Sequence, residues 1–189
     1  KNMHNDAHSD LQINNSEEGT TMIFQRLRAI FLLGLTLSCA TSFALEEGDT
    51  IPEFNLASIY EGQPNIQLSN LEGKTLYIDF WASWCAPCIT SLPLYNELYD
   101  KYKDNGLEVI AINVDNPIED GLDFLLDTPL DFLIPQDPEG DAAELFGVIG
   151  MPSSYLVSPD GNVELVHMGF RNGDINVIEE EIKKVLQEN

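Results

Sequence analysis

The feature that most constrains the fold of this chain is a pair of cysteines, Cys85 and Cys88, placed where one sequence pattern gives way to another. Residues 75–81, just before the pair, are mostly apolar, which predicts a buried strand. After the pair, apolar residues recur at steps of three and four up to Tyr102, which predicts an amphipathic helix. We therefore expect the cysteines at a strand-to-helix junction, with Cys85 at the helix N-terminus.

This placement has chemical consequences for both sulfur atoms. Unpaired backbone N–H groups and the helix dipole favour negative charge at a helix N-terminus. The Cys85 thiolate, the species that attacks disulfides, is therefore favoured. Cys88 lies one turn further along, within reach to resolve a mixed disulfide. Pro87 suits the first turn, because the N–H that proline lacks would be unpaired there. The spacing predicts a dithiol–disulfide centre.

The first 44 residues have the pattern of an export signal. Met22 is followed by Arg26 and Arg28, then by a short apolar run, and Ser42 and Ala44 are small residues at the two positions that a signal peptidase reads. The apolar run is shorter than the roughly 20 residues that span a bilayer, so we expect cleavage rather than a retained anchor. We expect residues 1–21 to be an upstream polar segment outside the fold, residues 22–44 a signal peptide and residues 45–189 a single domain.

Removal of this segment also removes Cys39, so the mature chain keeps only the cysteines of the pair. A disulfide across so short a loop constrains the unfolded chain little, so a purely stabilising role is poorly motivated. Haem attachment requires His after the second cysteine, where Ile89 stands. Structural zinc requires four ligands, and the mature chain adds only His167, which we expect to be a packed or surface residue. We expect no metal and no cofactor.

The composition is strongly acidic. Nine Lys and Arg residues oppose 32 Asp and Glu residues, which gives a formal net charge of −23. Nucleic acids and anionic membrane surfaces both require basic residues in their partners, so we expect neither as a ligand. Mutual repulsion of the acidic surfaces favours a monomer. Two interpretations of the acidity stay open: adaptation of the whole surface to a salty medium, and steering toward a basic partner.

The rest of the mature chain alternates strand and helix patterns. The expected elements are short strands over 54–58 and 66–68, a strand over 107–114, short helices over 120–126 and 141–146, an extended piece over 132–134, strands over 154–158 and 163–168, and a last helix from Asp174 to about Gln187. A Pro-Asp-Gly-Asn sequence joins the last two strands in a hairpin. This order predicts an α/β fold with a mixed sheet and helices on both faces.

The residues around the cysteines resemble a known family. Residues 79–88, Asp-Phe-Trp-Ala-Ser-Trp-Cys-Ala-Pro-Cys, are similar to the active-site stretch of the thioredoxin superfamily, and Pro93 matches the proline that kinks its active-site helix. Residues 150–161 resemble the cis-proline strand and hairpin of the exported TlpA/ResA-like branch, which is related to the AhpC/TSA redoxins. Residues 116–146 lie where this branch carries an insertion before that strand. The resemblance implies a thioredoxin fold with an N-terminal β extension.

The same resemblance implies roles for three catalytic side chains. Cys85 would be the nucleophile and Cys88 the resolving thiol. Asp79 matches the buried carboxylate of thioredoxin, which assists proton transfer at the second cysteine. A buried carboxyl group stays protonated near neutral pH, which suits a general acid or base. The alternative is an aspartate at a strand edge whose side chain reaches water.

Further roles concern Pro152, the fourth catalytic residue that the resemblance implies, and the binding of substrate. The resemblance implies that Pro152 follows a cis peptide bond and faces the disulfide, so that the Met151 backbone can pair with an incoming peptide. Trp84 would cover the sulfur pair and shape the docking surface together with Pro87. Packing of Trp84 in the core is the alternative.

These features together predict an exported thiol-disulfide oxidoreductase. The residues between the cysteines, Ala86 and Pro87, offer no cation, and Asp79 opposes a second negative charge, so we expect a reductant. Its substrates would be oxidised envelope proteins, with cytochrome c maturation as one task. Its electrons would come from a membrane thiol donor, because that compartment is oxidising. A disulfide donor, a Cu(I)-binding module, an interaction domain and a thiol peroxidase stay open as alternatives.

Overall fold

The computed structural model describes residues 44–188. The expected upstream segment and all of the expected signal peptide except Ala44 lie outside the described residues. Within the described part, no helix is long and apolar enough to cross a membrane.

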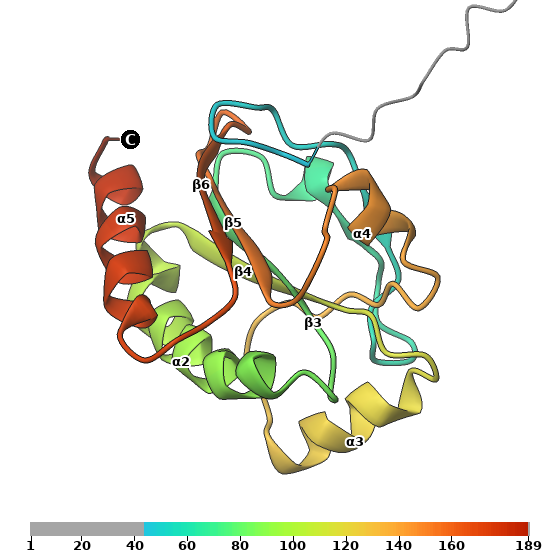
Figure 1. The fold of residues 1–189 in the computed structure, drawn as a ribbon. Coiled ribbons are helices and arrows are strands. Elements are labelled where there is room, and N and C mark those ends of the chain that lie inside the picture. Colours follow the sequence, from blue (N-terminus) through green and yellow to red (C-terminus); the bar gives the residue numbers. More distant parts are fainter. Residues whose placement is uncertain (1–43, 189) are drawn as a thin grey trace, which may run out of the picture. The chain divides into compact units, whose positions relative to one another are not determined.

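A four-stranded mixed sheet forms the centre of the fold (Figure 1), with the strand order β4-β3-β5-β6. Strand β3 (Thr75–Trp81) pairs in parallel with β4 (Leu107–Asn113) and antiparallel with β5 (Ser153–Val157). Strand β6 (Val163–Met168) pairs antiparallel with β5. Every residue of β3 and β4 is buried, as expected for strands covered on both faces.

Helices lie on both faces of this sheet. Helices α2 (Ala86–Tyr102) and α5 (Asp174–Glu188) cover one face, where they pack with alternate β3 residues that include Tyr77 and Trp81. Helix α4 (Asp141–Leu145) covers the other face, where Ile78 and Phe80 point. The two-residue strands β1 (Asn55–Leu56) and β2 (Ile66–Gln67) pair antiparallel, and Ile66 packs in the core cluster on the α4 face. The predicted fold class, a mixed sheet with helices on both faces, is confirmed.

The remaining elements complete the chain order. Helix α3 (Glu119–Asp127) follows β4, and its Phe124 ring lies 5.4 Å from the ring of Trp81. Short 3₁₀ turns occupy Leu68–Asn70 and Lys103–Asn105.

The expected elements are present, with shifts at their ends. The predicted strand over 54–58 is wrong in length, because only Asn55 and Leu56 pair across the hairpin. The extended piece at 132–134 continues the sheet beside β4, through isolated bridges that pair Leu133 with Ile110 and Gln136 with Asn113. Helix and strand boundaries depend on which partner lies opposite, which sequence periodicity does not report.

Candidate active site

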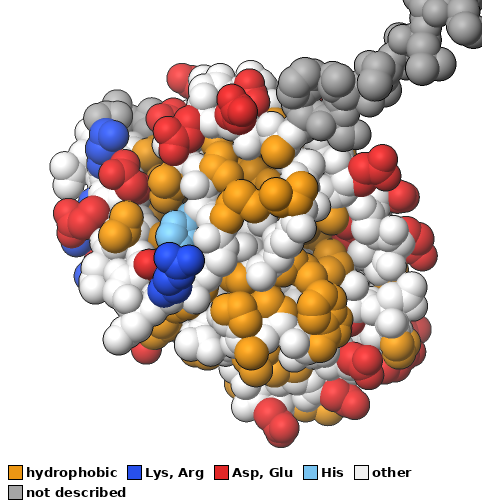
Figure 2. Space-filling model, viewed as in Figure 1, with side chains coloured by type: hydrophobic (Ala, Val, Ile, Leu, Met, Phe, Trp, Pro, Cys, Tyr) orange, Lys and Arg blue, Asp and Glu red, His pale blue; other side chains and the backbone are white. Residues whose placement is uncertain are grey.

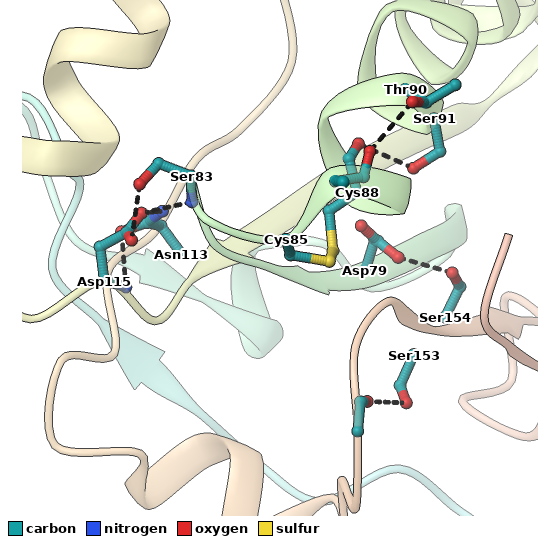
Figure 3. The surroundings of a disulfide bond; sticks show 12 residues. Asp79, Ser83, Cys85, Cys88, Thr90, Ser91, Asn113, Asp115, Ser153 and Ser154 are labelled. Carbon is teal, nitrogen blue, oxygen red and sulfur yellow. Dashed lines mark hydrogen bonds between the residues drawn. A yellow bond between two sulfur atoms is a disulfide. The ribbon is translucent and has the colours of Figure 1, made fainter.

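The cysteine pair forms a disulfide at the start of α2 (Figure 3), with the two Cα atoms 5.2 Å apart. Cys85 is the residue that precedes the helix, and its carbonyl accepts the first helical hydrogen bond, from the N–H of Ile89. Pro87 lies in the first turn, where its missing N–H leaves no partner unpaired. Cys85 is 6% exposed, whereas Cys88 is fully buried at 0%. The pair is therefore unequal, and only Cys85 has surface open to a reaction partner.

Asp79 lies in the middle of β3, the central strand of the sheet that leads to the cysteines. Its side chain is fully buried, so it does not reach water at a strand edge. It shares a strand face with Tyr77 and Trp81, which pack in the same core cluster as Cys85 and Cys88. Figure 3 shows its carboxylate beside the disulfide, with one oxygen directed to Ser154. The geometry places an ionisable group behind the redox pair.

The environment of Asp79 raises its affinity for a proton. Burial raises the pKa of Asp79 from 3.8 to about 8, and the hydrogen bond from Ser154 Oγ to Asp79 Oδ1, 2.6 Å long, opposes this rise. Asp79 Oδ2 is buried and has no hydrogen-bond partner among the described residues. A carboxyl group with a pKa near 8 exchanges a proton close to neutral pH, which suits a general acid or base.

Two tyrosines share this buried region, and sequence reasoning took them only as apolar residues of a strand and a helix. The rings of Tyr77 and Tyr95 meet edge to face, with their centroids 5.0 Å apart. Neither hydroxyl has a hydrogen-bond partner among the described residues. Burial, together with the nearby charge of Asp79, raises the pKa of both phenols. Among the described residues of this core, Asp79 therefore faces two neutral phenols, and its burial favours the neutral form.

The Met151–Pro152 peptide bond is cis, as the family resemblance implies. Pro152 is buried and Met151 half-buried immediately before β5. Ser153, the next residue, pairs with Phe80 near the end of β3 that leads to the cysteines. The cis-proline segment and the cysteine pair thus occupy the same end of the sheet. A second cis bond, between Asn116 and Pro117, has no counterpart in the sequence prediction.

Trp84 is 68% exposed, so its ring does not pack in the core. Ile149, two residues before Met151, is also exposed, as is Met168, which pairs with Ser153 across the β5–β6 ladder. Figure 2 shows apolar side chains gathered in the middle of one face, with acidic side chains toward its rim. The exposed Trp84 ring thus lies next to the accessible cysteine, and its role in docking stays a prediction.

A buried network that sequence reasoning missed supports the loop before the cysteines (Figure 3). The Ser83 N–H and hydroxyl each donate a 2.9 Å hydrogen bond to the carboxylate of Asp115. Asn113 Nδ2 donates to the same carboxylate at 2.7 Å, and Asp115 is fully buried. A Cβ on Gly121 would lie 2.7 Å from Asn113 Nδ2, so glycine is required beside this network. The sequence order could have indicated this network, because Ser83 follows β3 and Asp115 follows β4, and the carboxyl ends of parallel strands meet at one edge of the sheet.

His167 lies on β6, where it pairs with Ser154 across the β5–β6 ladder. His167 Nε2 is 3.2 Å from Asp174 Oδ2, at the start of α5, and its side chain is largely buried. Within residues 44–188, no group of three or more His, Cys, Asp or Glu side chains is arranged to hold a metal ion.

Comparison with known proteins places the chain in a family. Residues 48–166 match the AhpC/TSA family. The chain is 36% identical over 124 residues to the thiol-disulfide oxidoreductase ResA of Oceanobacillus iheyensis, covering 65% of each chain. It is 34% identical over 141 residues to the ResA of Bacillus thuringiensis subsp. konkukian, covering 75% of this chain and 79% of the relative.

Solved structures agree with this placement. A putative thiol:disulfide interchange protein DsbE from Chlorobium tepidum superposes with a TM-score of 0.72 at 40% sequence identity, over 76% of this chain and 99% of that one. StoA from Bacillus subtilis superposes with a TM-score of 0.59 at 26% identity, over 69% of this chain and 96% of that one. The chain therefore belongs to the AhpC/TSA family and, within it, to the ResA-like thiol-disulfide oxidoreductases of thioredoxin fold.

Proposed function

We propose that this chain works outside the cytosol and reduces disulfides of envelope proteins through Cys85 and Cys88. The observation that carries the proposal is the unequal burial of the pair: Cys85 is partly accessible, and Cys88 is closed off in the core that Asp79 faces. A nucleophile must reach its substrate, whereas a resolving thiol must reach only its neighbour.

The reaction begins at Cys85. Its thiolate attacks one sulfur of the substrate disulfide, which forms a mixed disulfide and releases the other substrate sulfur as a thiolate. The Cys88 thiol then gives its proton to the Asp79 carboxylate and attacks the Cys85 sulfur. This step closes the Cys85–Cys88 disulfide and releases the second substrate sulfur. Two electrons pass from the protein to the substrate, which takes up two protons.

The local charges favour this direction of electron flow. Thiolate stabilisation makes a protein of this kind oxidising, because it favours the reduced form. Ala86 and Pro87 carry no charge, and the buried Asp79 carboxyl group, with a pKa raised to about 8, supplies no positive charge to a thiolate in the same core. The start of α2 stabilises the Cys85 thiolate, and neither residue between the cysteines adds a cation. The pair is thus suited to give electrons rather than to take them.

The proposed location and partners follow from the signal-like segment at residues 22–44 and from the resemblance to ResA and DsbE proteins. A reductant in an oxidising compartment needs a supply of electrons. A membrane thiol donor would reduce the Cys85–Cys88 disulfide after each turnover. The cysteines of apocytochrome c, which must be reduced before haem attaches, are the substrate that we propose first.

The reduction potential of the Cys85–Cys88 pair tests the proposed direction of electron flow. The chain, with Cys39→Ser so that no third thiol interferes, is equilibrated against glutathione and dithiothreitol buffers. A potential near or below about −220 mV supports a reductant, and a potential near about −120 mV makes the protein a disulfide donor instead.

Reduction of a peptide closed by a Cys-x-x-Cys-His disulfide tests the substrate class. Fractionation of cells, with mass analysis of the exported form, tests export and cleavage after Ala44.

A further inference from the structure

Arg171 is the one arginine of the described residues, and it differs from the lysines there in its partners. Every lysine of that part of the chain forms an ion pair: Lys74 with Glu108, Lys101 with Glu179, Lys103 with Asp100, Lys183 with Glu180 and Lys184 with Glu181. The Arg171 guanidinium forms none with any carboxylate of residues 44–188. In a chain with 32 acidic residues, an arginine without a carboxylate partner is a cation left available for another molecule.

The backbone around Arg171 is held in place even though its side chain is unpaired. Arg171 lies in the loop between β6 and α5, and its N–H donates a 2.8 Å hydrogen bond to Asp174 Oδ2. The same carboxylate oxygen lies 3.2 Å from His167 Nε2. Gly173, with φ near 99°, adopts a backbone conformation that favours glycine. Asp174 is therefore occupied by the loop itself, and the backbone from which the Arg171 side chain extends is held in place.

A pocket of about 290 Å³ joins this loop to the active-site helix. Pro87, Thr90 and Leu94 line it from α2, and Phe170, Arg171 and Ile175 line it from the loop and α5. Pro87 stands between the two cysteines, so the pocket adjoins the redox centre. Figure 1 shows the β6–α5 loop passing beside α2. The lining combines apolar side chains with one cation, a combination that suits an apolar group next to a carboxylate.

We propose that this pocket binds an acidic side chain of the substrate protein, with its carboxylate on Arg171 and an adjacent apolar group against Leu94 and Phe170. The proposal rests on the proposed function, because it assigns the recognition of the substrate that Cys85 attacks. An arginine holds a carboxylate through paired hydrogen bonds, and these are stronger than neutral ones. The Debye length is about 8 Å at physiological ionic strength, so this short contact outweighs repulsion by the remote acidic surface.

The test uses three synthetic peptides, each closed by one disulfide, in which the residues flanking the cysteines are glutamate, glutamine or lysine. The full chain carries Cys39→Ser and is reduced beforehand, and the second-order rate constant of its single turnover is measured by acid quenching and separation of closed from reduced peptide. The variants are Arg171→Ala, Arg171→Lys and, as a control at a cation that is already paired, Lys103→Ala. The disulfide of 2-mercaptoethanol serves as a small neutral substrate that cannot reach the pocket and the cysteines at once.

We expect the glutamate peptide to react about 3- to 10-fold faster than the glutamine peptide, and the lysine peptide to be slowest. We expect Arg171→Ala to react with the three peptides at equal rates. Arg171→Lys should keep part of the preference for the glutamate peptide, and Lys103→Ala should keep all of it. Equal rates for the glutamate and glutamine peptides, or an unchanged preference in Arg171→Ala, would overturn the proposal. So would equal slowing of Arg171→Ala on the small disulfide, because the arginine would then act on Cys85 and not on the peptide.

The small disulfide also separates this proposal from the function on which it rests. If the wild-type chain reduces it and the peptides show no preference, the proposed function stands and the role of Arg171 is wrong. If the wild-type chain reduces no disulfide at all, the proposed function is wrong, and the assignment of the pocket falls with it.

Discussion

The hydroxyl of Ser154 donates a 2.6 Å hydrogen bond to Asp79 Oδ1, and this contact joins β5 to β3 behind the cysteine pair. The two residues are directly opposite each other in the antiparallel ladder. Burial raises the pKa of Asp79 to about 8, and the Ser154 hydrogen bond works in the opposite direction. The proton affinity of the carboxyl group behind the redox pair is therefore set partly by a residue of the cis-proline strand.

Replacement of Asp79 by asparagine removes the proposed proton acceptor for Cys88. We expect the resolving step to slow by about 100-fold at pH 7, while attack by Cys85 on the substrate keeps its rate. Rapid acid quenching, followed by separation of mixed disulfide from free product, measures the two steps. An unchanged decay of the mixed disulfide would show that Asp79 takes no part in proton transfer.

The pKa of Asp79 also predicts how stability depends on pH. The folded-state pKa of about 8 lies above the usual aspartate pKa of 3.8, so between these values the folded protein holds a proton that the unfolded chain has released. The free energy of unfolding contributed by this group therefore falls as pH rises through that window, by about 1.4 kcal/mol per unit, and levels off above it. Denaturant titrations of oxidised wild type and Asp79→Asn between pH 5 and 9 should show the variant gaining relative stability up to about pH 8. A constant difference across this range would contradict the raised pKa.

Removal of the Ser154 hydroxyl should raise the pKa of Asp79 further, because the hydrogen bond that stabilises the carboxylate is lost. We expect the pH profile of the resolving step in Ser154→Ala to shift toward higher pH. Ser153→Ala is the matched control, since the Ser153 hydroxyl donates instead to the carbonyl of Gly150. The same shift in both variants would assign the effect to the strand and not to the hydrogen bond.

The Asp115 network predicts a graded loss of stability. Asp115→Ala leaves the Ser83 N–H and hydroxyl and the Asn113 amide without their acceptor, so we expect a loss of about 3 kcal/mol in the free energy of unfolding. Ser83→Ala removes one of these bonds and should cost about 1 kcal/mol. Urea titration of the oxidised proteins measures both values. If Ser83→Ala lowers the free energy of unfolding as much as Asp115→Ala does, loss of the shared acceptor is not the cause of the Asp115→Ala destabilisation.

The two tryptophans near the cysteines should respond differently to truncation. Trp84 is exposed, so Trp84→Ala should change the free energy of unfolding by less than about 0.5 kcal/mol while it slows reaction with protein disulfides. Trp81 is fully buried and donates its indole N–H to the carbonyl of Ala111, so Trp81→Ala should cost about 3–5 kcal/mol. Denaturant titration and a protein-disulfide reduction assay separate the two effects. A protein-substrate rate that is unchanged in Trp84→Ala would exclude this side chain from docking.

The amino-acid sequence by itself determined the fold class and the location of the redox pair. Hydrophobic periodicity is a local property, and it changes from a strand pattern to a helix pattern at Cys85 and Cys88. The match over residues 79–88 also pointed to Asp79, because that carboxyl group lies on an otherwise apolar strand.

Tertiary structure decided which distant groups surround those residues. The sheet register sets Ser154 opposite Asp79, parallel pairing of β3 with β4 brings Asp115 to Ser83, and helix packing places Arg171 in a pocket with Pro87. The two residues of each pair are more than thirty positions apart in the sequence, so no local sequence pattern indicates the contact. Proton affinity and substrate contacts depend on such neighbours, because burial and electrostatic interactions act through space and not along the chain.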